Sequence, residues 1–514
     1  MRVKHSMINV FTGIGSQIII TLLSFISRSV FIYYLGVEYL GINGLFTNIL
    51  GMLSLAEAGI GSAIIYSLYK PVAENDTKKI RVLMKFYRNA YLIIAVVILL
   101  LGLSLLPFLE YFIKEASIDN IHLIYGFFLI NTVSSYLFSH KISFLNVCQK
   151  GYIVTGIYTI SSLVTTLIRL LVLFLTQNYL LYLITELVVN IATSLVIADV
   201  VGRKYPYLKS KEKASLEQED KKSIVKNVKA LVMHRIGGYM VFGTDNIIIA
   251  SYVSLAAVGL YSNYSMLINI CRTLIGQIFD NITHSVGNLV ALEDDNKIYE
   301  VFKIIMLCNF WIYSFFSIIL FITIEPFISL WLGNDFIMAN SILIILLISF
   351  YVSGMRRSIS SIKTTAGIFQ EDRFVPFFEA AINLGASIIL VKYMGIAGVF
   401  LGTLISTLLG PFWIAPYLVY KKVFHISVVD YFKRYLLFLF IGISTCMVTN
   451  LITNSISIEG ILGLILKGII CLIIPNLLFL IVFSRTKEFQ YITEVIWNLF
   501  NPRIKKSTVQ KVEM

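Results

Sequence analysis

Charged residues are scarce in this sequence of 514 residues. Only 14% of the residues are Asp, Glu, Lys or Arg, whereas soluble domains contain about 25%. Hydrophobic residues make up 57%, and the apolar stretches recur along the whole length, many of them near the roughly 20 residues that cross a bilayer. This composition excludes a soluble fold and predicts an all-α, polytopic membrane protein.

The sequence also lacks the short motifs of common catalytic and metal sites. Its five cysteines lie in or beside apolar segments and include no CxxC pair, so we expect neither a disulfide nor a metal site. No GxxxxGK[ST] motif is present, which excludes ATP hydrolysis by a P-loop. The longest predicted segment outside the membrane, around residues 202–227, is too short for a soluble catalytic domain. We therefore expect no enzymatic activity, no catalytic residues and no cofactor.

A cleavable signal peptide is not expected. The first apolar run, residues 7–35, is longer than the hydrophobic region of a signal peptide, carries Arg28 and lacks a small-residue cleavage site. We expect this run to remain in the protein as its first transmembrane helix.

Hydropathy along the chain predicts about 14 transmembrane helices. We place them at residues 8–35, 39–66, 88–109, 119–140, 151–176, 179–201, 229–254, 257–284, 303–324, 337–358, 374–393, 395–420, 435–453 and 460–484.

Positive residues are distributed unequally between the two sides of the predicted membrane protein. With the N-terminus inside, and with residues at the ends of spans counted with the adjoining loop, 35 of the 42 Lys and Arg residues lie on inner loops and tails, 2 on outer loops and 5 within spans. This asymmetry follows the positive-inside rule and places both termini in the cytoplasm. The net charge of +13 therefore belongs to the cytoplasmic face, and we expect no nucleic-acid partner.

Two junctions between spans resemble each other. Leu40–Leu50 reads LGINGLFTNIL at the junction of spans 1 and 2, and Val258–Ile268 reads VGLYSNYSMLI at the junction of spans 7 and 8. Both follow a span that starts inside, which indicates a parallel repeat of six helices. We therefore expect an N-lobe (helices 1–6) at residues 1–201, a cytoplasmic inter-lobe loop at 202–228, a C-lobe (helices 7–12) at 229–424, and helices 13–14 with a cytoplasmic tail at 425–514.

The first span carries one polar stripe on an otherwise apolar helix. Gln17, Thr21, Ser24 and Arg28 follow one another at spacings of four, three and four residues, so they share a helix face. Such a stripe is typical of a helix that lines a water-filled cavity. The alternative is that Arg28 pairs with a carboxylate and only holds helices together.

Four arginines within spans indicate an anionic substrate. A guanidinium group binds phosphate oxygens through a planar fork of donors and keeps its charge on burial. The substrate-binding residues that we predict are Arg28, Arg272, Arg235, Gln17, Ser24 and Arg169. The carboxylates within the membrane that could bind a coupling proton or Na⁺ are Glu57, Asp245, Asp280 and Glu379. For each of these residues the alternative is a structural ion pair between helices.

Two stretches, one in each half, resemble a known family. Arg373–Ser406 reads RFVPFFEAAINLGASIILVKYMGIAGVFLGTLIS and is followed by Trp413, Pro416, Lys421 and Phe424. The other stretch is LGVEYLGINGLF with LSLAEAGIGSAIIYSLYKPVA (Leu53–Ala73) after it. Both are similar to the polysaccharide-transporter branch of the multidrug/oligosaccharidyl-lipid/polysaccharide exporter superfamily.

The resemblance implies a flippase of the bacterial cytoplasmic membrane. Members of this branch move repeat units of O-antigen, capsule and related glycans on undecaprenyl pyrophosphate, through a central cavity that opens alternately to either side. It implies membrane lipids as surroundings, and a polymerase and glycosyltransferases as candidate partners. Related lipid flippases rely on arginines in the first and eighth helices, where Arg28 and Arg272 fall. Cavity residues diverge in this branch, so no sugar-specific residue can be transferred.

Three other functions are left open by the sequence. A cation-coupled multidrug exporter of the same superfamily would need an acidic cavity, whereas this chain supplies arginines. A membrane-embedded polysaccharide polymerase would need a large outer loop, and the predicted outer loops are all short. A purely structural role in a synthesis complex would leave the polar stripe of the first span without a purpose.

Overall fold

The computed structural model describes residues 2–57, 60–113, 118–209, 243–368 and 370–500. Over these ranges the chain is helical and contains no β-strand. Eleven helices are long and apolar enough to cross a membrane, and each coincides with one predicted span. The predicted fold class, an all-α polytopic membrane protein, is confirmed.

Two compact units make up the chain. The first unit comprises residues 1–262 and 387–399, and the second comprises residues 263–386 and 400–514. The predicted division into lobes at residues 201, 228 and 424 remains a prediction.

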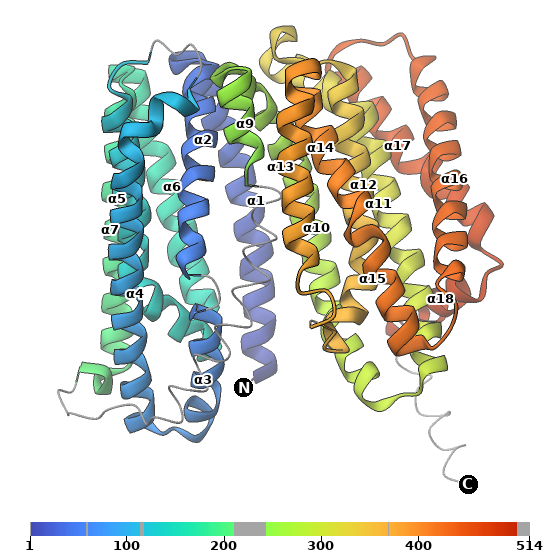
Figure 1. The fold of residues 1–514 in the computed structure, drawn as a ribbon, viewed down its shortest axis with the longest axis horizontal. Helices are drawn as coiled ribbons and strands as arrows, with labels where there is room; N and C mark the ends of the chain where they lie inside the picture. The colour runs from blue at the N-terminus through green and yellow to red at the C-terminus, as the bar shows by residue number, and fades with distance from the viewer. Residues whose placement is uncertain (1, 58–59, 114–117, 210–242, 369, 501–514) are drawn as a thin grey trace. The chain divides into compact units, whose positions relative to one another are not determined.

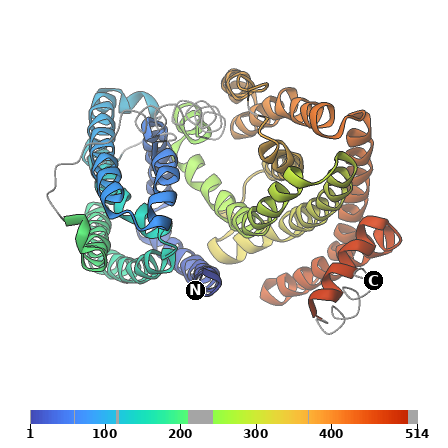
Figure 2. The same cartoon turned by 90° about the horizontal axis from the view of Figure 1, so that it is seen from below.

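The first unit is built mainly from long helices that pack side by side (Figures 1 and 2). Its helices are α1 (Arg2–Leu35), α2 (Val37–Leu53), α3 (Ile60–Glu74), α4 (Thr77–Leu105), α5 (Ile121–Val147), α6 (Gly151–Thr176), α7 (Tyr179–Lys204) and α9 (Asp245–Tyr252). The long helix α10 (Leu255–Leu292) begins in this unit and continues into the second.

The second unit is organised around α11, which packs against α12, α16 and α17. Its helices besides α10 are α11 (Asp295–Leu332), α12 (Asn340–Thr365), α13 (Val375–Met394), α14 (Ile396–Leu409), α15 (Pro411–Val419), α16 (Val429–Asn454), α17 (Gly460–Phe483) and α18 (Lys487–Phe500). Residues 387–399, where α13 turns into α14, are the part of this hairpin that belongs to the first unit.

Close packing of α11 on α12 depends on one glycine. A Cβ added to Gly354 would lie 2.1 Å from Cδ1 of the Tyr313 ring, so a side chain at this position cannot coexist with the tyrosine as it stands. Further along α11, Phe310 packs against Phe438 of α16 and Phe479 of α17, with ring centroids 4.7 and 5.2 Å apart. Aromatic contacts of this kind build the core of the second unit.

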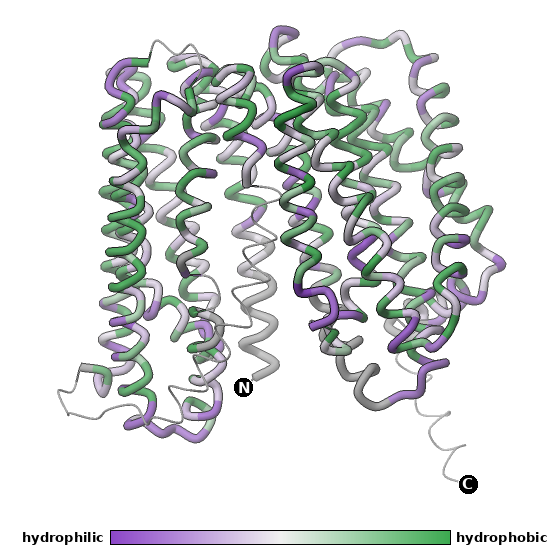
Figure 3. The backbone as a smooth tube through the Cα atoms, viewed as in Figure 1, coloured by the Kyte–Doolittle hydropathy of each residue, from purple (hydrophilic) through white to green (hydrophobic). Residues whose placement is uncertain are grey.

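Apolar side chains also cover the outside of both units. Leu22 of α1, Leu100 of α4 and Leu462 of α17 are 60%, 62% and 70% exposed. Figure 3 shows apolar residues along the middle of the long helices and hydrophilic residues concentrated nearer to their ends. In water such surfaces would aggregate, whereas lipid chains solvate them, so the pattern fits helices embedded in a bilayer.

Three predicted spans differ from simple helices or extend beyond the described residues. The span at 39–66 is broken: α2 ends at Leu53, a 3₁₀ turn covers Ser54–Glu57, and α3 starts at Ile60. The span at 257–284 lies inside the longer α10. Of the span at 229–254, the structure describes only the C-terminal part, from residue 243 on. This part contains α9.

The predicted span at 395–420 also contains a break. Its first part is α14, which ends at Leu409, and Pro411 starts α15 after Gly410. A proline inside a continuous helix would remove a hydrogen bond and clash with the preceding turn, which accounts for the new start. A π-helical turn then covers Tyr420–Phe424, the local form in which helices often carry functional or strained residues.

Candidate functional site

The polar stripe of α1 is only partly buried along its length. Gln17 Nε2 donates a hydrogen bond to Thr21 Oγ1 at 3.4 Å, and Ser24 Oγ donates to the carbonyl oxygen of Thr21 at 2.7 Å. These two bonds stay within the helix. The stripe is therefore satisfied locally and remains able to face a polar ligand or water.

Arg28 closes this stripe at the end of α1 that leads into α2. Its Nη2 donates a hydrogen bond to Ser262 Oγ of α10, and the same hydroxyl donates to the carbonyl oxygen of Gly259 at 2.7 Å. This partner is a neutral oxygen. Both interpretations of Arg28, a ligand that faces a cavity and a structural ion pair with a carboxylate, stay predictions.

Arg272 lies on the exposed face of α10, in the second unit. Its guanidinium carbon lies 5.9 Å from the centre of the Phe350 ring of α12, and the described residues include no carboxylate paired with it. A guanidinium group exposed to hydrocarbon would be costly. Because α10 contains a predicted transmembrane span, we expect the exposed Arg272 to face water or an anionic ligand and not lipid.

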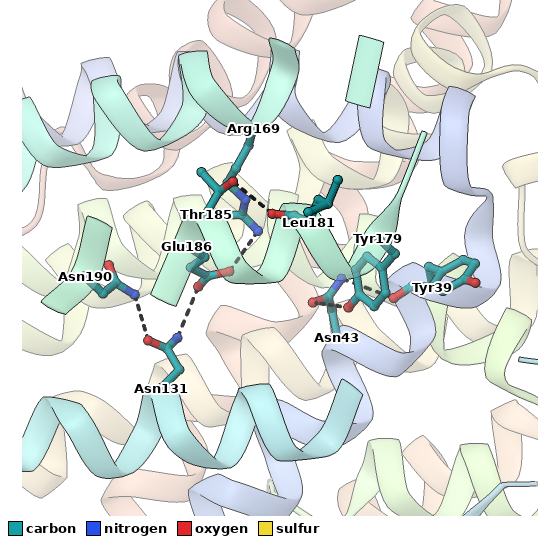
Figure 4. A network of polar contacts seen from close by, with 9 residues as sticks. All are labelled: Tyr39, Asn43, Asn131, Arg169, Tyr179, Leu181, Thr185, Glu186 and Asn190. Carbon is teal, nitrogen blue, oxygen red and sulfur yellow. Dashed lines mark hydrogen bonds and ion pairs between the residues drawn. The ribbon is translucent and has the colours of Figure 1, made fainter. Parts of the chain in front are cut away.

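Arg169 is held in a network of polar contacts in the first unit (Figure 4). Its Nη2 lies 2.9 Å from Glu186 Oε2, and its guanidinium carbon lies 3.6 Å from the centre of the Tyr182 ring. Asn131 Nδ2 donates to the other carboxylate oxygen of Glu186 at 3.5 Å, and Asn190 Nδ2 donates to Asn131 Oδ1 at 3.0 Å. These contacts join α5, α6 and α7, so Arg169 has the structural partner that the alternative interpretation requires.

A second polar network surrounds Glu57, at the break between α2 and α3. Tyr91 OH donates a hydrogen bond to Glu57 Oε1, and Tyr87 OH lies 3.5 Å from Tyr91 OH. Tyr87 OH also donates to Ser143 Oγ at 3.1 Å. All these partners are neutral hydroxyls, and no basic side chain of the described residues forms an ion pair with Glu57. Glu57 is therefore a half-buried carboxylate in a network of uncharged groups.

Glu379 of α13 is buried and has a basic partner. Its Oε1 lies 3.7 Å from Arg356 Nη1 of α12 and accepts a hydrogen bond from Thr407 Oγ1 of α14 at 3.1 Å. One turn further along α13, Asn383 Nδ2 donates to Thr403 Oγ1 of α14 at 2.8 Å. The positive charge of Arg356 compensates the carboxylate, so these contacts hold α12, α13 and α14 together.

The remaining predicted residues are only partly covered by the structure. Asp245 is buried and is the first residue of α9, where the helix dipole favours a negative charge. Asp280 lies in α10, but its side chain is outside the described part of the chain. Arg235 lies outside the described residues, and its role stays a prediction.

Two arginines of α12 were not among the predicted site residues. Arg356 pairs with Glu379, and Arg357 Nη2 donates to the carbonyl oxygen of Gly276 in α10 at 3.4 Å. The predicted span ends at residue 358, so both arginines fall at its end and count with the inner loop. The helix continues to Thr365, which places them on a helix that packs inside the unit. A longer apolar-polar periodicity after residue 358 is the signal that could have found them.

Metal ligands do not gather in the described part of the chain. No group of three or more His, Cys, Asp or Glu side chains there could hold a metal ion, and all five cysteines are free thiols.

Comparison with known proteins relates this architecture to a sequence family. The model of the family described as "polysaccharide biosynthesis protein" matches residues 6–281. No curated protein matches the chain.

Several solved structures share the fold. The chain is similar to the lipid II flippase MurJ in an inward closed conformation, with 14% identity and a TM-score of 0.64 over 94% of this chain and 99% of that chain. It is also similar to a point mutant of the Vibrio cholerae MATE transporter VcmN, with 15% identity and a TM-score of 0.57 over 83% and 99%. An inward-facing MATE family multidrug transporter of the MOP superfamily gives 14% identity and a TM-score of 0.55 over 77% and 93%.

Proposed function

Because the chain belongs to the family of polysaccharide biosynthesis proteins and has the fold of flippases and transporters of the MOP superfamily, we propose that it is a lipid-linked oligosaccharide flippase. Its substrates are undecaprenyl-pyrophosphate-linked repeat units of capsule, exopolysaccharide or O-antigen type. It moves them across the bacterial cytoplasmic membrane by alternating access, with both termini in the cytoplasm, and it performs no covalent chemistry.

The observation that carries this proposal is the state of Arg272. This arginine is exposed on α10, which contains a predicted transmembrane span, and among the described residues it lies beside the ring of Phe350 and is not paired with a carboxylate. A pyrophosphate group carries about two negative charges, and moving such charges through hydrocarbon without a partner is costly. A guanidinium fork in a solvated space lowers that cost while the lipid tail stays in the bilayer.

Arg28 supplies the second proposed contact with the pyrophosphate. It donates to Ser262 Oγ, a neutral oxygen, and a phosphate oxygen is a stronger acceptor for the same donor. Gln17 and Ser24 on the same face of α1 offer hydrogen bonds to the sugar hydroxyls. Arg169 and Arg235 remain predicted ligands, although the ion pair with Glu186 favours a structural role for Arg169.

We further propose that an ion gradient drives transport. Glu57, Asp245, Asp280 and Glu379 are the predicted carboxylates, and Glu57 is the best placed of them. Its hydrogen-bond donor, the hydroxyl of Tyr91, carries no charge. Binding or release of a proton or Na⁺ by Glu57 therefore changes the net charge of this region. Glu379, in contrast, is already compensated by Arg356.

A cation-coupled multidrug exporter is the second candidate function. It would need carboxylates free to attract an organic cation. Two of the carboxylates within the described spans, Glu186 and Glu379, are paired with arginines, which favours the flippase.

The proposal is tested by Arg272→Gln and Arg272→Lys variants in cells that make the polysaccharide. We expect Gln to reduce surface polysaccharide by at least tenfold and Lys to rescue it partly, because Lys keeps the charge but loses the fork. Arg203→Gln is the matched control, since this arginine is largely exposed at the end of α7 and pairs with Asp199 on the same helix. Normal export from Arg272→Gln at normal membrane abundance would rule out the phosphate contact.

A further inference from the structure

Two glycines bring the starts of α2 and α10 into backbone contact. A Cβ added to Gly41 would lie 1.9 Å from the carbonyl oxygen of Leu255, and one added to Gly259 would lie 2.2 Å from the carbonyl oxygen of Val37. Both obstacles are backbone atoms, which cannot rotate away as a side chain can. Only glycine permits this approach at either position. We call these four residues the outer contact.

The outer contact follows the internal repeat of the sequence. Gly259 follows Gly41 by 218 residues, and Leu255 follows Val37 by the same number. This offset also relates the two junction sequences. In each helix the first residue, Val37 or Leu255, contributes a carbonyl oxygen to the contact. The glycine one turn later lies against the carbonyl oxygen of the other helix. The contact is therefore pseudo-symmetric, with each repeat offering the same surface to the other.

Two hydrogen bonds beside the glycines obey the same relation. Arg28 Nη2 donates to Ser262 Oγ, and Asn246 Nδ2 donates to the carbonyl oxygen of Gly44 at 3.4 Å. By the offset of the repeat, Arg28 is equivalent to Asn246, and Gly44 is equivalent to Ser262. The repeat thus pairs a proposed phosphate ligand, Arg28, with an amide that makes the equivalent contact and carries no charge.

The position of the outer contact along the chain assigns it to one face of the membrane. It adjoins the short turns that connect α1 to α2, at Gly36, and α9 to α10, at Val253 and Ser254. These turns contain no Lys or Arg, and the positive-inside rule places them outside. The contact joins helices from the two predicted lobes at that outer face.

We propose that the outer contact is the extracytoplasmic gate of the transporter and that Arg28 reports its state. The inference rests on the proposed alternating access. In the closed gate the guanidinium of Arg28 is held by Ser262. Separation of α2 from α10 breaks that bond and presents the same donors to a phosphate oxygen. Contacts between Cα–H groups and carbonyl oxygens are individually weak, which suits a junction that must open in every cycle.

The gate predicts a specific effect of a single methyl group. A normal contact between carbon and oxygen needs about 3.3–3.6 Å, so Gly41→Ala or Gly259→Ala would force the helices apart by about 1–2 Å. Both variants should therefore favour the outward-open state. Gly156→Ala on α6 is the matched control, because a Cβ added there meets no heavy atom within 4 Å.

Labelling of an introduced thiol measures the opening directly. The five natural cysteines are replaced by serine, Ser24→Cys is introduced on the polar stripe, and intact cells receive a membrane-impermeant thiol reagent. We expect the labelling rate to rise at least threefold in Gly41→Ala and Gly259→Ala and to stay unchanged in Gly156→Ala. Unchanged labelling in both gate variants at normal abundance would overturn the proposal, and so would an increase seen only from the cytoplasmic side.

A crosslink across the contact provides the opposite perturbation. A Cβ added to Gly44 would lie 3.0 Å from Cγ1 of Val258, so Gly44→Cys with Val258→Cys brings two thiols within reach of a disulfide. Oxidation, in which each thiol loses a proton and an electron to an added oxidant such as copper phenanthroline, should stop export, and reduction should restore it. Persistent export with a fully formed crosslink would contradict the gate. If the thiol labelling follows the gate variants but no lipid-linked glycan moves, the gate stands and the proposed substrate is wrong.

Discussion

The ion pair between Arg169 and Glu186 separates a structural arginine from a substrate ligand. The two side chains are 18% and 30% exposed, and their closest oxygen–nitrogen distance is 2.9 Å. Removing one partner from a buried pair typically costs about 3–5 kcal/mol, whereas exposed pairs contribute at most about 1 kcal/mol. Since this pair is partly exposed, we expect Arg169→Gln to destabilise the first unit by about 1–3 kcal/mol, between those two limits.

The contact of Arg169 with Tyr182 adds to this effect. The guanidinium carbon lies 3.6 Å from the ring centre, and a desolvated cation–π contact contributes about 1–2 kcal/mol. Glu186→Gln keeps this contact and can still accept from Asn131, so it should destabilise less than Arg169→Gln. The double variant Arg169→Gln with Glu186→Gln removes both charges and should be more stable than Arg169→Gln alone.

The assay is thermal unfolding of the purified variants in detergent, together with surface polysaccharide in cells. The structural interpretation predicts that Arg169→Gln lowers the melting temperature by several degrees and reduces export only in proportion to its lower abundance. Arg203→Gln, which breaks an exposed pair on one helix, is the control and should leave both unchanged. A variant Arg169→Gln with unchanged stability and no export would refute the reasoning and restore Arg169 as a substrate ligand.

Three other contacts lead to predictions of their own. Glu57→Gln should leave membrane abundance intact and make transport in vesicles insensitive to collapse of the proton and sodium gradients, and equal dependence on the gradients in both proteins would exclude Glu57. Gly354→Ala should lower the melting temperature, because the added methyl meets the ring of Tyr313 and overpacking costs about 1–3 kcal/mol; an unchanged value would show that α11 and α12 can separate freely. The hydrogen bond from Lys422 lowers the pKa of the exposed Glu371, so its small stabilisation is present above the unfolded pKa of about 4.3 and is lost as the pH falls through the lower folded value. Lys422→Gln should therefore lose less stability between pH 6 and pH 3 than the wild-type protein, and an equal loss in both proteins would contradict this contribution.

The transmembrane helices were the most predictable part of the fold. Length and hydropathy determine whether a segment crosses a bilayer, and they placed the eleven spans that the described residues contain. The break after Leu53 was missed, because the apolar pattern continues from α2 through the 3₁₀ turn into α3. The new helix start at Pro411 was missed for a similar reason, since hydropathy does not register the hydrogen bond that proline removes.

Partners of the membrane charges could not be read from the sequence. Spacing along one helix shows which residues share a face, but the rotation of each helix against its neighbours decides whether Arg169 meets Glu186 or a cavity. The same limit applied to Glu379, whose partner Arg356 was not expected inside the unit. The repeat was more informative, because its offset alone aligns Gly41 with Gly259, the two glycines that meet the opposite backbone.

Transport by the purified protein tests the central claim most directly. The protein is reconstituted in vesicles with a fluorescent undecaprenyl-pyrophosphate-linked oligosaccharide, and the fraction of glycan that crosses the bilayer is followed with an impermeant quencher. We predict rapid movement by the wild-type protein, at least tenfold slower movement by Arg272→Gln, and wild-type movement by Arg203→Gln. Equal rates for the wild-type protein and Arg272→Gln at equal incorporation, or no movement of the glycolipid by the wild-type protein, would contradict the account.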